Sequence, residues 1–472
     1  SRRAARPGGA RPRGGGPERQ PRGGASAWKA ESELFPPLDA AAQAALARLP
    51  EALARVRPLS AAHRRSLPED IAKLSRALTA ERAELRRPYW SRPAFVSAYL
   101  YYFLPWNLVR LARLFRGLPL PTPATAEGPA LLLDAGSGPL TVPLALWLAR
   151  PEWRSLPIQV LALDSARQPL ELGRALFVAM GEALGEAVWP VRLAKGPLES
   201  LAAHAQPLLE AGGRPWLVTA ANVLNEARPP RGGRGGPTLD DEEDDGADVP
   251  LPGLTESRLD RLLSAWSPLL APAPDAGNGV PRQGGSPALL FVEPGTRLGG
   301  NTLMRLRALA VEGGLHAVAP CVADTRCPLK RGAWCHFTFS PAGAPRWLAE
   351  LSTAAGLAKR SLSLSPLLLR AAPEVETDAA RAGEEPAAPR ARVLSSPFDV
   401  PGVNGLARYA CAPCGLALLE DAGTLAPGSL VDLGEAAKPR PGGKQARRDA
   451  RSGARIFAAP QERAQRVFKK KS

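Results

Sequence analysis

Histidine, methionine and cysteine are all scarce in this chain of 472 residues, which has four histidines, two methionines and five cysteines. The cysteines are also unevenly placed, because all five lie between Cys321 and Cys414. An odd number of cysteines argues against a disulfide framework and favours a reducing compartment. With so few imidazoles in the chain, thiolates are the natural ligands for a soft metal centre.

A hydrophobic run long enough to span a bilayer is also missing. The most apolar stretch, 94–109, is interrupted by Pro105 and Asn107, so we expect a buried helix there. Residues 1–27 lack the apolar stretch of a secretory signal. We therefore expect a cytoplasmic protein without a membrane partner.

Positive charge is concentrated at the two ends of the sequence. Residues 1–24 contain seven arginines and one glutamate, and residues 438–472 contain twelve lysines or arginines and two acidic residues. These segments account for the whole net charge of +16, so the middle of the chain is electrically balanced. Basic ends on a neutral body favour binding to nucleic acid with a strong salt dependence, and solvated ends without a partner are the alternative.

The composition predicts several units joined by linkers, since the chain has 45 glycines and 51 prolines. Along the chain we predict a disordered basic arm (1–27), a helical region (28–125), an α/β domain (126–345), a C-terminal module (346–435) and a basic tail (436–472). Low-complexity inserts are expected within the domain and the module, at 228–253 and 371–392.

Segments rich in alanine, leucine and arginine between residues 35 and 115 predict helices, which we expect prolines such as Pro50 and Pro88 to separate. The aromatic stretch 89–106 is expected to pack in the core. No basic residue interleaves its rings from Phe95 onward, as a platform for stacked bases would favour.

Short apolar runs that alternate with helical patterns follow. We expect strands at 130–134, 158–163, 216–220 and 288–292, with helices between them. This alternation predicts a doubly wound α/β fold with a parallel sheet.

A glycine-containing loop follows the first of these strands and opens a helix. It contains Asp134, Gly136 and Gly138, at a place where backbone amides can approach a ligand closely. The second strand ends at Asp164, where the diol of a ribose would need an acceptor. Asn225 follows a later strand and is expected to face the same cleft, with helix capping as its alternative role.

Asp134, Gly136, Gly138 and Asp164 resemble motifs I and II of the class I S-adenosylmethionine-dependent methyltransferases. In that family the loop holds the methionine part of the cofactor, and the second acidic residue holds the adenosine ribose. The resemblance implies a Rossmann-like methyltransferase fold with S-adenosylmethionine as cofactor. Leu140 stands where that family has a third glycine, and no residue can be assigned a catalytic role.

The cysteines form a second candidate site. Cys321, Cys327 and Cys335 lie in one loop, with five and seven residues between them, so the loop can wrap a centre larger than one ion. A fourth ligand would come from Cys411 or Cys414. An iron-sulfur cluster and a zinc ion both accept such ligands. The alternative is that the cysteines are buried in the core and bind no metal.

Strings around these cysteines resemble the signature of the methyltransferase-like family of small ribosomal subunit proteins. They are Glu293-Pro-Gly-Thr296, Pro320-Cys321, Cys327-Pro328 and Trp334-Cys335. That family occurs in bacteria and in mitochondria, where its member is called methyltransferase-like protein 17. The likeness runs from about residue 88 to residue 433.

This resemblance implies a small-subunit assembly or translation factor that binds rRNA and has a methyltransferase fold and a [4Fe-4S] cluster. Matched by position, Cys321, Cys327 and Cys335 are the first three ligands and Cys411 the fourth, with Cys414 as the alternative. An active S-adenosylmethionine-dependent rRNA methyltransferase is the alternative function. We expect a monomer in the bacterial cytoplasm.

Overall fold

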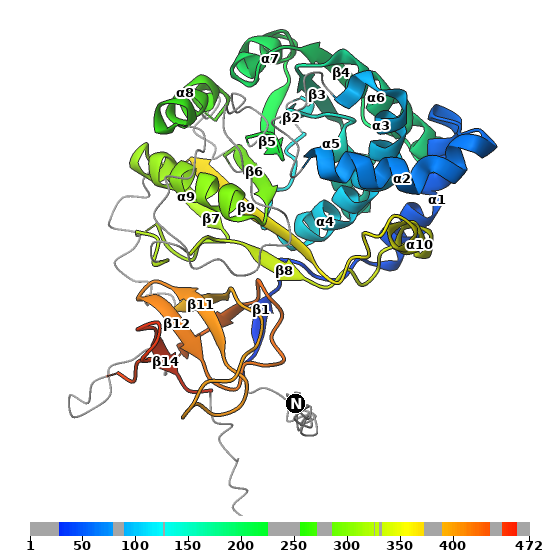
Figure 1. The fold of residues 1–472 in the computed structure, drawn as a ribbon. Coiled ribbons are helices and arrows are strands. Elements are labelled where there is room, and N and C mark those ends of the chain that lie inside the picture. The colour runs from blue at the N-terminus through cyan, green and yellow to red at the C-terminus, as the bar shows by residue number, and fades with distance from the viewer. Residues whose placement is uncertain are drawn as a thin grey trace, which may run out of the picture.

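The structure is a computed structural model that describes residues 28–78, 89–125, 128–224, 255–270, 286–324, 326–329, 333–371, 389–434 and 446–459. These residues form a large α/β unit and a smaller β-sheet unit, which lies below the large unit in Figure 1. The predicted arm 1–27 and the predicted insert 228–253 lie outside the described residues.

A mostly parallel sheet forms the middle of the large unit. Its strands are β2 (Ala130–Ala135), β3 (Ile158–Asp164), β4 (Val191–Lys195), β5 (Arg214–Ala221), β6 (Ala288–Pro294), β7 (Leu315–Ala319), β8 (Phe337–Phe339) and β9 (Leu362–Ala371). Their order is β4-β3-β2-β5-β6-β9-β7, and β8 also pairs with β9. Strand β9 runs antiparallel to its neighbours. The order of β2 to β6 is that of a Rossmann sheet, so the predicted α/β fold is confirmed.

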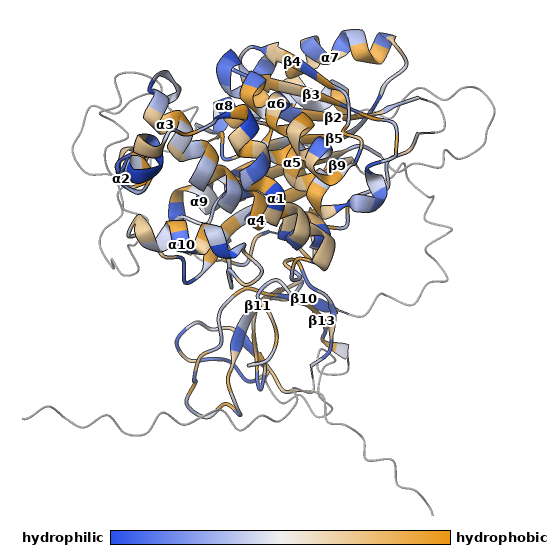
Figure 2. Cartoon of the chain, turned by 90° about the vertical axis from the view of Figure 1, so that its right-hand side faces the viewer, coloured by the Kyte–Doolittle hydropathy of each residue, from blue (hydrophilic) through white to orange (hydrophobic). Residues whose placement is uncertain are grey.

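Helices cover both faces of this sheet (Figure 1). On β2, Leu132 packs into the cluster that includes the N-terminal helices, while Leu131 and Leu133 pack into a second cluster on the opposite face. Because neighbouring side chains of a strand point to opposite faces, an uninterrupted apolar strand supports two cores. Figure 2 shows the apolar residues gathered around the strands of the large unit. The covering helices are α5 (Thr141–Ala149) and α6 (Arg167–Leu184) with the N-terminal helices on one face, and α7 (Leu201–Glu210), α8 (Glu256–Trp266) and α9 (Arg297–Glu312) on the other.

The predicted N-terminal helical region contains α1 (Ala40–Val56), α2 (Ala61–Leu78), α3 (Pro93–Ala98), the π-helical segment η3 (Tyr99–Phe103) and α4 (Leu104–Gly117). Its aromatic residues are largely buried, as predicted, and Tyr102 and Trp106 lie in the core. The expected break at Pro50 is wrong, because α1 continues through it. Leu49 and Leu53 of α1 are fully buried, and this burial offsets the roughly 3 kcal/mol that an interior proline costs a helix.

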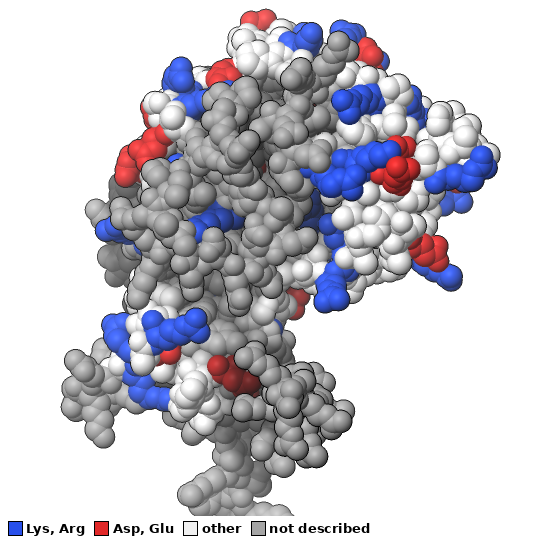
Figure 3. Space-filling view, viewed as in Figure 1, with Lys and Arg blue, Asp and Glu red and all other residues white. Residues whose placement is uncertain are grey.

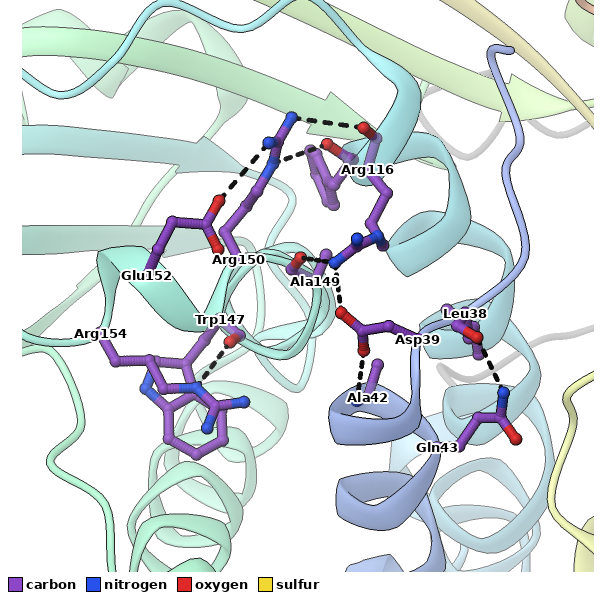
Figure 4. A network of polar contacts seen from close by, with 11 residues as sticks. Leu38, Asp39, Ala42, Gln43, Arg116, Trp147, Ala149, Arg150, Glu152 and Arg154 are labelled. Carbon is purple, nitrogen blue, oxygen red and sulfur yellow. Dashed lines mark hydrogen bonds and ion pairs between the residues drawn. The ribbon is translucent and has the colours of Figure 1, made fainter.

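Arg116 joins α1 to two other helices of the large unit (Figure 4). Asp39 caps α1 by accepting a hydrogen bond from the amide of Ala42, and its other oxygen pairs with Arg116 at the end of α4. Arg116 also donates to the carbonyl of Ala149 at the end of α5. The ion pair of Asp39 and Arg116 thus joins the start of α1 to the ends of α4 and α5, which fixes where α1 enters the fold.

The small unit is a second sheet, in the order β1-β13-β10-β11-β12-β14. Its strands are β1 (Ala30–Ser32), β10 (Arg390–Val393), β11 (Arg408–Ala412), β12 (Gly415–Leu419), β13 (Leu430–Asp432) and β14 (Arg455–Phe457). Trp28 lies in its core and donates from Nε1 to the carbonyl of Glu420. Residues 28–32, which we assigned to the helical region, therefore belong to the small unit.

Two further boundaries differ from the predicted ones. Helix α10 (Arg346–Ala354) and strand β9 belong to the large unit, although we placed residues 346–371 in the C-terminal module. In the predicted tail, residues 446–459 are described and add β14 to the small sheet, where Phe457 is buried. Buried apolar side chains explain both differences. Leu364 and Leu367–Leu369 are buried on the two faces of β9, and Phe457 is buried in the small sheet.

Candidate cofactor loop and cysteine site

The predicted cofactor loop lies at the carboxyl end of β2. Gly136 has a φ of +70°, and a Cβ added there would lie 2.4 Å from Cγ2 of Val223. Glycine is therefore required for conformation and for space. Gly138 has a φ of +52°, but its Cβ position faces open space, so this side of the loop is accessible to a ligand.

Asp134 is buried at the end of β2. Its Oδ1 accepts a hydrogen bond of 2.6 Å from the hydroxyl of Thr219 on β5. Its Oδ2 is also buried and has no hydrogen-bond partner among the described residues. Burial raises the pKa of Asp134 to about 7. The site thus holds a carboxyl group whose ionised form lacks a counter-charge, and a cationic group of a ligand would supply one.

Asp164 lies at the end of β3, beside this loop. Its Oδ2 accepts a hydrogen bond of 2.9 Å from the amide of Gly138, and its Oδ1 accepts one of 2.9 Å from the amide of Ala166. The two predicted acidic residues are therefore on neighbouring strands and at one edge of the sheet. Each carboxylate oxygen has a second lone pair, so Asp164 can still accept from a diol.

Leu140 lies in the left-handed region that favours glycine, with φ +57° and ψ +39°. Its side chain is fully buried. Gly173 on α6 makes room for the loop, because a Cβ there would lie 2.3 Å from the carbonyl carbon of Pro139. The left-handed turn is thus kept by packing without glycine, at a backbone cost of about 1–2 kcal/mol.

Asn225, the last predicted cofactor residue, lies outside the described residues. Just before it, the amide of Leu224 donates to Oε1 of Glu293 at the end of β6, and Asn222 has a φ of +58°. The sequence did not predict that Thr219 and Asn222 would lie at the carboxyl edge of the sheet, beside the cofactor loop. Their only signal was their place near the end of an apolar strand.

The cysteine loop connects two strands that pair with the same neighbour. Strand β7 pairs with the carboxyl half of β9 and β8 with its amino half, so residues 320–336 leave and rejoin one edge of the sheet. The backbone of Cys335 is held at the end of this loop. Its carbonyl accepts from Ser365 Oγ on β9 at 2.7 Å, and its amide lies 3.3 Å from Sδ of Met304 on α9.

Four of the five cysteines line a single pocket of about 50 Å³. Cys321, Cys327 and Cys335 come from the loop of the large unit, while Cys411 comes from β11 of the small unit. Cys414 is exposed in the turn between β11 and β12 and does not line this pocket. A single water needs about 10–15 Å³ by this measure, so the pocket has room for several atoms.

The rest of the pocket is apolar apart from one cation. Its other lining residues are Leu303, Met304, Arg307, Pro320, Val322, Ala323, Pro328, Leu329, Pro366, Leu367, Leu394 and Ala412. Sequence reasoning missed Arg307 and Met304, which lie on α9, one turn apart and far from the cysteine strings. No sequence signal distinguished Arg307 from the other arginines of the chain.

Burial and neighbouring thiols raise the pKa of two of the pocket cysteines, Cys335 and Cys411. Burial raises the pKa of Cys335 well above its usual value, and Cys321, Cys327 and Cys411 raise it further. The pKa of Cys411 is raised to about 12 for the same two reasons. Thiolates are therefore costly here without a positive partner, which a metal centre would provide.

Across the described parts of the chain, no three His, Cys, Asp or Glu side chains converge closely enough to hold one metal ion. Zinc bonds its sulfur ligands at about 2.3 Å, which requires four converging sulfurs. The cysteines of a four-iron cluster bind its separate corners, so they surround a larger space. The metal-bound module stays a prediction.

The family model described as mitochondrial small ribosomal subunit Rsm22 matches residues 282–352. The predicted resemblance to small ribosomal subunit proteins is confirmed over this segment. The matched segment includes β6, α9 and the loop with Cys321, Cys327 and Cys335. No curated protein matches the chain.

Two solved structures share a general likeness. The crystal structure of the SAM dependent methyltransferase from Agrobacterium tumefaciens is 14% identical, with a TM-score of 0.26, and the match covers 58% of this chain and 63% of that protein. Geranyl diphosphate methyltransferase in complex with GPP and sinefungin is 10% identical, with a TM-score of 0.24, and the match covers 64% of this chain and 98% of that one. Since both TM-scores are low, the fold assignment rests on the strand order.

In the described residues, every helix is too short or too polar to cross a bilayer.

Proposed function

We propose that this protein is an assembly or translation factor of the small ribosomal subunit that binds rRNA. In this proposal the carboxyl edge of the large sheet binds S-adenosylmethionine, and Cys321, Cys327, Cys335 and Cys411 hold a [4Fe-4S] cluster. The observation that carries the proposal is the shared pocket of these four cysteines. Three of them lie in the segment that matches the small ribosomal subunit family.

The donor set fits a cluster better than a single ion. The four cysteines surround a pocket with room for several atoms, and the separate corners of a four-iron cluster would need such room. Apart from Arg307, the rest of the lining is apolar, which would keep solvent from an iron-sulfur centre. Cys411 is the fourth ligand in this proposal, because Cys414 is exposed and outside the pocket.

The residues at the sheet edge fit a ligand that carries positive charge. S-adenosylmethionine, when bound, supplies an activated methyl group, and both its sulfonium and its ammonium group are cationic. Asp134 would face the methionine part and Asp164 the ribose, with Gly136 and Gly138 bringing the backbone close. Asn225 would complete the site. Because a cation favours ionised Asp134, affinity should rise with pH through about 7.

Metal analysis tests the cluster. The protein purified without oxygen should be brown and contain about four iron and four sulfide per chain. Cys327→Ser should lose most of the iron and some thermal stability, because the loop loses its ligand. Cys414→Ser is the matched control and should keep both. Stoichiometric zinc in a colourless protein contradicts the cluster, and iron loss in Cys414→Ser contradicts the choice of Cys411.

Turnover separates the proposed factor from an active rRNA methyltransferase. Immature small subunits would be incubated with radiolabelled S-adenosylmethionine and either the unchanged protein or Asp134→Ala. Binding of the cofactor without transfer to rRNA supports the assembly or translation factor. Transfer that disappears in Asp134→Ala supports the enzyme. If neither protein binds the cofactor, the sheet edge is neither a cofactor site of the factor nor the active site of a methyltransferase.

A further inference from the structure

Helix α9 places one arginine in the wall of the cysteine pocket. Arg307 is 7% exposed, and its Nε donates a hydrogen bond of 3.0 Å to Sγ of Cys321. Its Nη2 donates a second bond of 2.8 Å to the carbonyl of Ala323. One rigid guanidinium group therefore holds both the sulfur of a predicted ligand and the backbone two residues later.

The backbone before Cys321 is held from the other unit. Arg392, on β10 of the small sheet, is 6% exposed and donates from Nε to the carbonyl of Pro320 at 3.2 Å. It also donates from Nη1 to the carbonyl of Gly428 at 2.9 Å. Cys321 is thus fixed from both sides by buried arginines, before any metal is considered.

Two buried cations beside four thiols require a physical reason. Removing a guanidinium group from water costs several kcal/mol unless charge or hydrogen bonds compensate. Arg392 donates to neutral carbonyls, and Arg307 donates to one carbonyl and one sulfur. The carboxylate of Asp324 also acts on Arg307, and that of Glu31 acts on Arg392. A centre ligated by four thiolates has negative charge, so it would add to this compensation at both arginines.

We propose that Arg307 is a positioning residue for the metal centre. Its guanidinium group fixes the Cys321 sulfur and raises the reduction potential of the centre. This inference rests on the proposed cluster. Hydrogen bonds to ligand sulfurs and nearby positive charge both stabilise the more negative, reduced state. Arg307 supplies both a hydrogen bond and a positive charge at the Cys321 sulfur. Arg392 supplies a positive charge, and its described hydrogen bonds go to carbonyl oxygens.

The test compares the anaerobically purified full chain with three variants: Arg307→Met, Arg307→Lys and Arg305→Met. Arg305→Met is the matched control, because it removes a charge from the same helix and Arg305 does not line the pocket. The measurement is the midpoint potential of the bound centre by redox titration with electron paramagnetic resonance. Iron content per chain is measured in the same samples.

We expect Arg307→Met to favour the oxidised state about tenfold, equal to about 59 mV for a one-electron couple. Arg307→Lys keeps the charge but cannot hold the sulfur and the Ala323 carbonyl in one planar fork, so its potential should also fall, by less. Arg305→Met should match the unchanged protein. A purely structural role would change the iron content and leave the potential unaltered.

Two results overturn the inference alone: an unchanged potential in Arg307→Met, or an equal fall in Arg305→Met. If Arg307→Met binds no iron, Arg307→Lys decides, and an unchanged potential there overturns the inference. Absence of iron and sulfide from the unchanged protein overturns the proposed cluster as well, so the two failures are distinguishable.

Discussion

Asp134 shows how one buried residue links fold and ligand. The sequence placed it correctly at the end of a strand, but its partner Thr219 comes from a strand far along the chain. The hydroxyl compensates one carboxyl oxygen and leaves the other without a partner among the described residues. The fold thus accepts a cost at this position, as is common at ligand sites.

A pH dependence of stability follows. Since the folded-state pKa of Asp134 is about 7 against an ordinary value of 3.8, the folded protein binds more protons than the unfolded chain between these values. The free energy of unfolding should therefore fall as pH rises from about 4 to about 7, by on the order of 4 kcal/mol from this group.

Asp134→Asn keeps an acceptor for Thr219 and cannot ionise, so it should lose this contribution. The measurement is urea unfolding across this pH range for both proteins. Equal slopes of stability against pH would show that Asp134 is not the group responsible.

Strand β14 shows how an element can be concealed by composition. The region around it is rich in arginine, and we predicted a tail there. Residues Arg455–Phe457 nevertheless pair with β12, and Phe457 fills the core of the small sheet while Ile456 lies on the other face. A strand of three residues gives too short a pattern for sequence analysis. Its apolar residues can be recognised as a strand only once their pairing with β12 is known.

Phe457→Ala should therefore loosen the small unit, at a cost of about 3–5 kcal/mol for a fully buried phenylalanine. Hydrogen exchange of the β12 amides, read by mass spectrometry, should become faster, because β14 protects that edge. Ile456→Ala is the control and should cost less, since Ile456 is only partly buried. Unchanged protection of β12 in Phe457→Ala would show that β14 does not stabilise the unit.

At the scale of the whole molecule, surface charge is unevenly distributed between the two units. On the face seen in Figure 3, basic and acidic side chains are interspersed over the large unit, and basic residues gather on the small unit near β14. Segment 446–459 contains four arginines and one aspartate. Positive charge is therefore present both on the small unit and in the sequence that follows it.

Residues 460–472 contain five lysines or arginines and one glutamate, and their removal leaves β14 in place. Deleting them should weaken binding to small-subunit rRNA and reduce the slope of log affinity against log salt by roughly 3 to 4. Filter binding at several salt concentrations measures this slope. A variant with the five basic residues changed to glutamine should behave like the deletion, and an unaltered slope in both would show that the segment does not contact phosphate.

The sequence by itself determined the elements with long local patterns. Short, mostly apolar runs specified β2, β3, β5 and β6, and helical periodicity specified the N-terminal region, because backbone geometry repeats over neighbouring residues. The positions of Asp134, Gly136 and Asp164 followed from these elements.

Only the tertiary structure decided which distant residues meet. It brought Cys411 of the small sheet to three cysteines of the large unit, left Cys414 in solvent and placed Arg307 against Cys321. It also kept α1 continuous through Pro50. These outcomes depend on packing between segments far apart in the chain, and local spacing contains no information about such contacts.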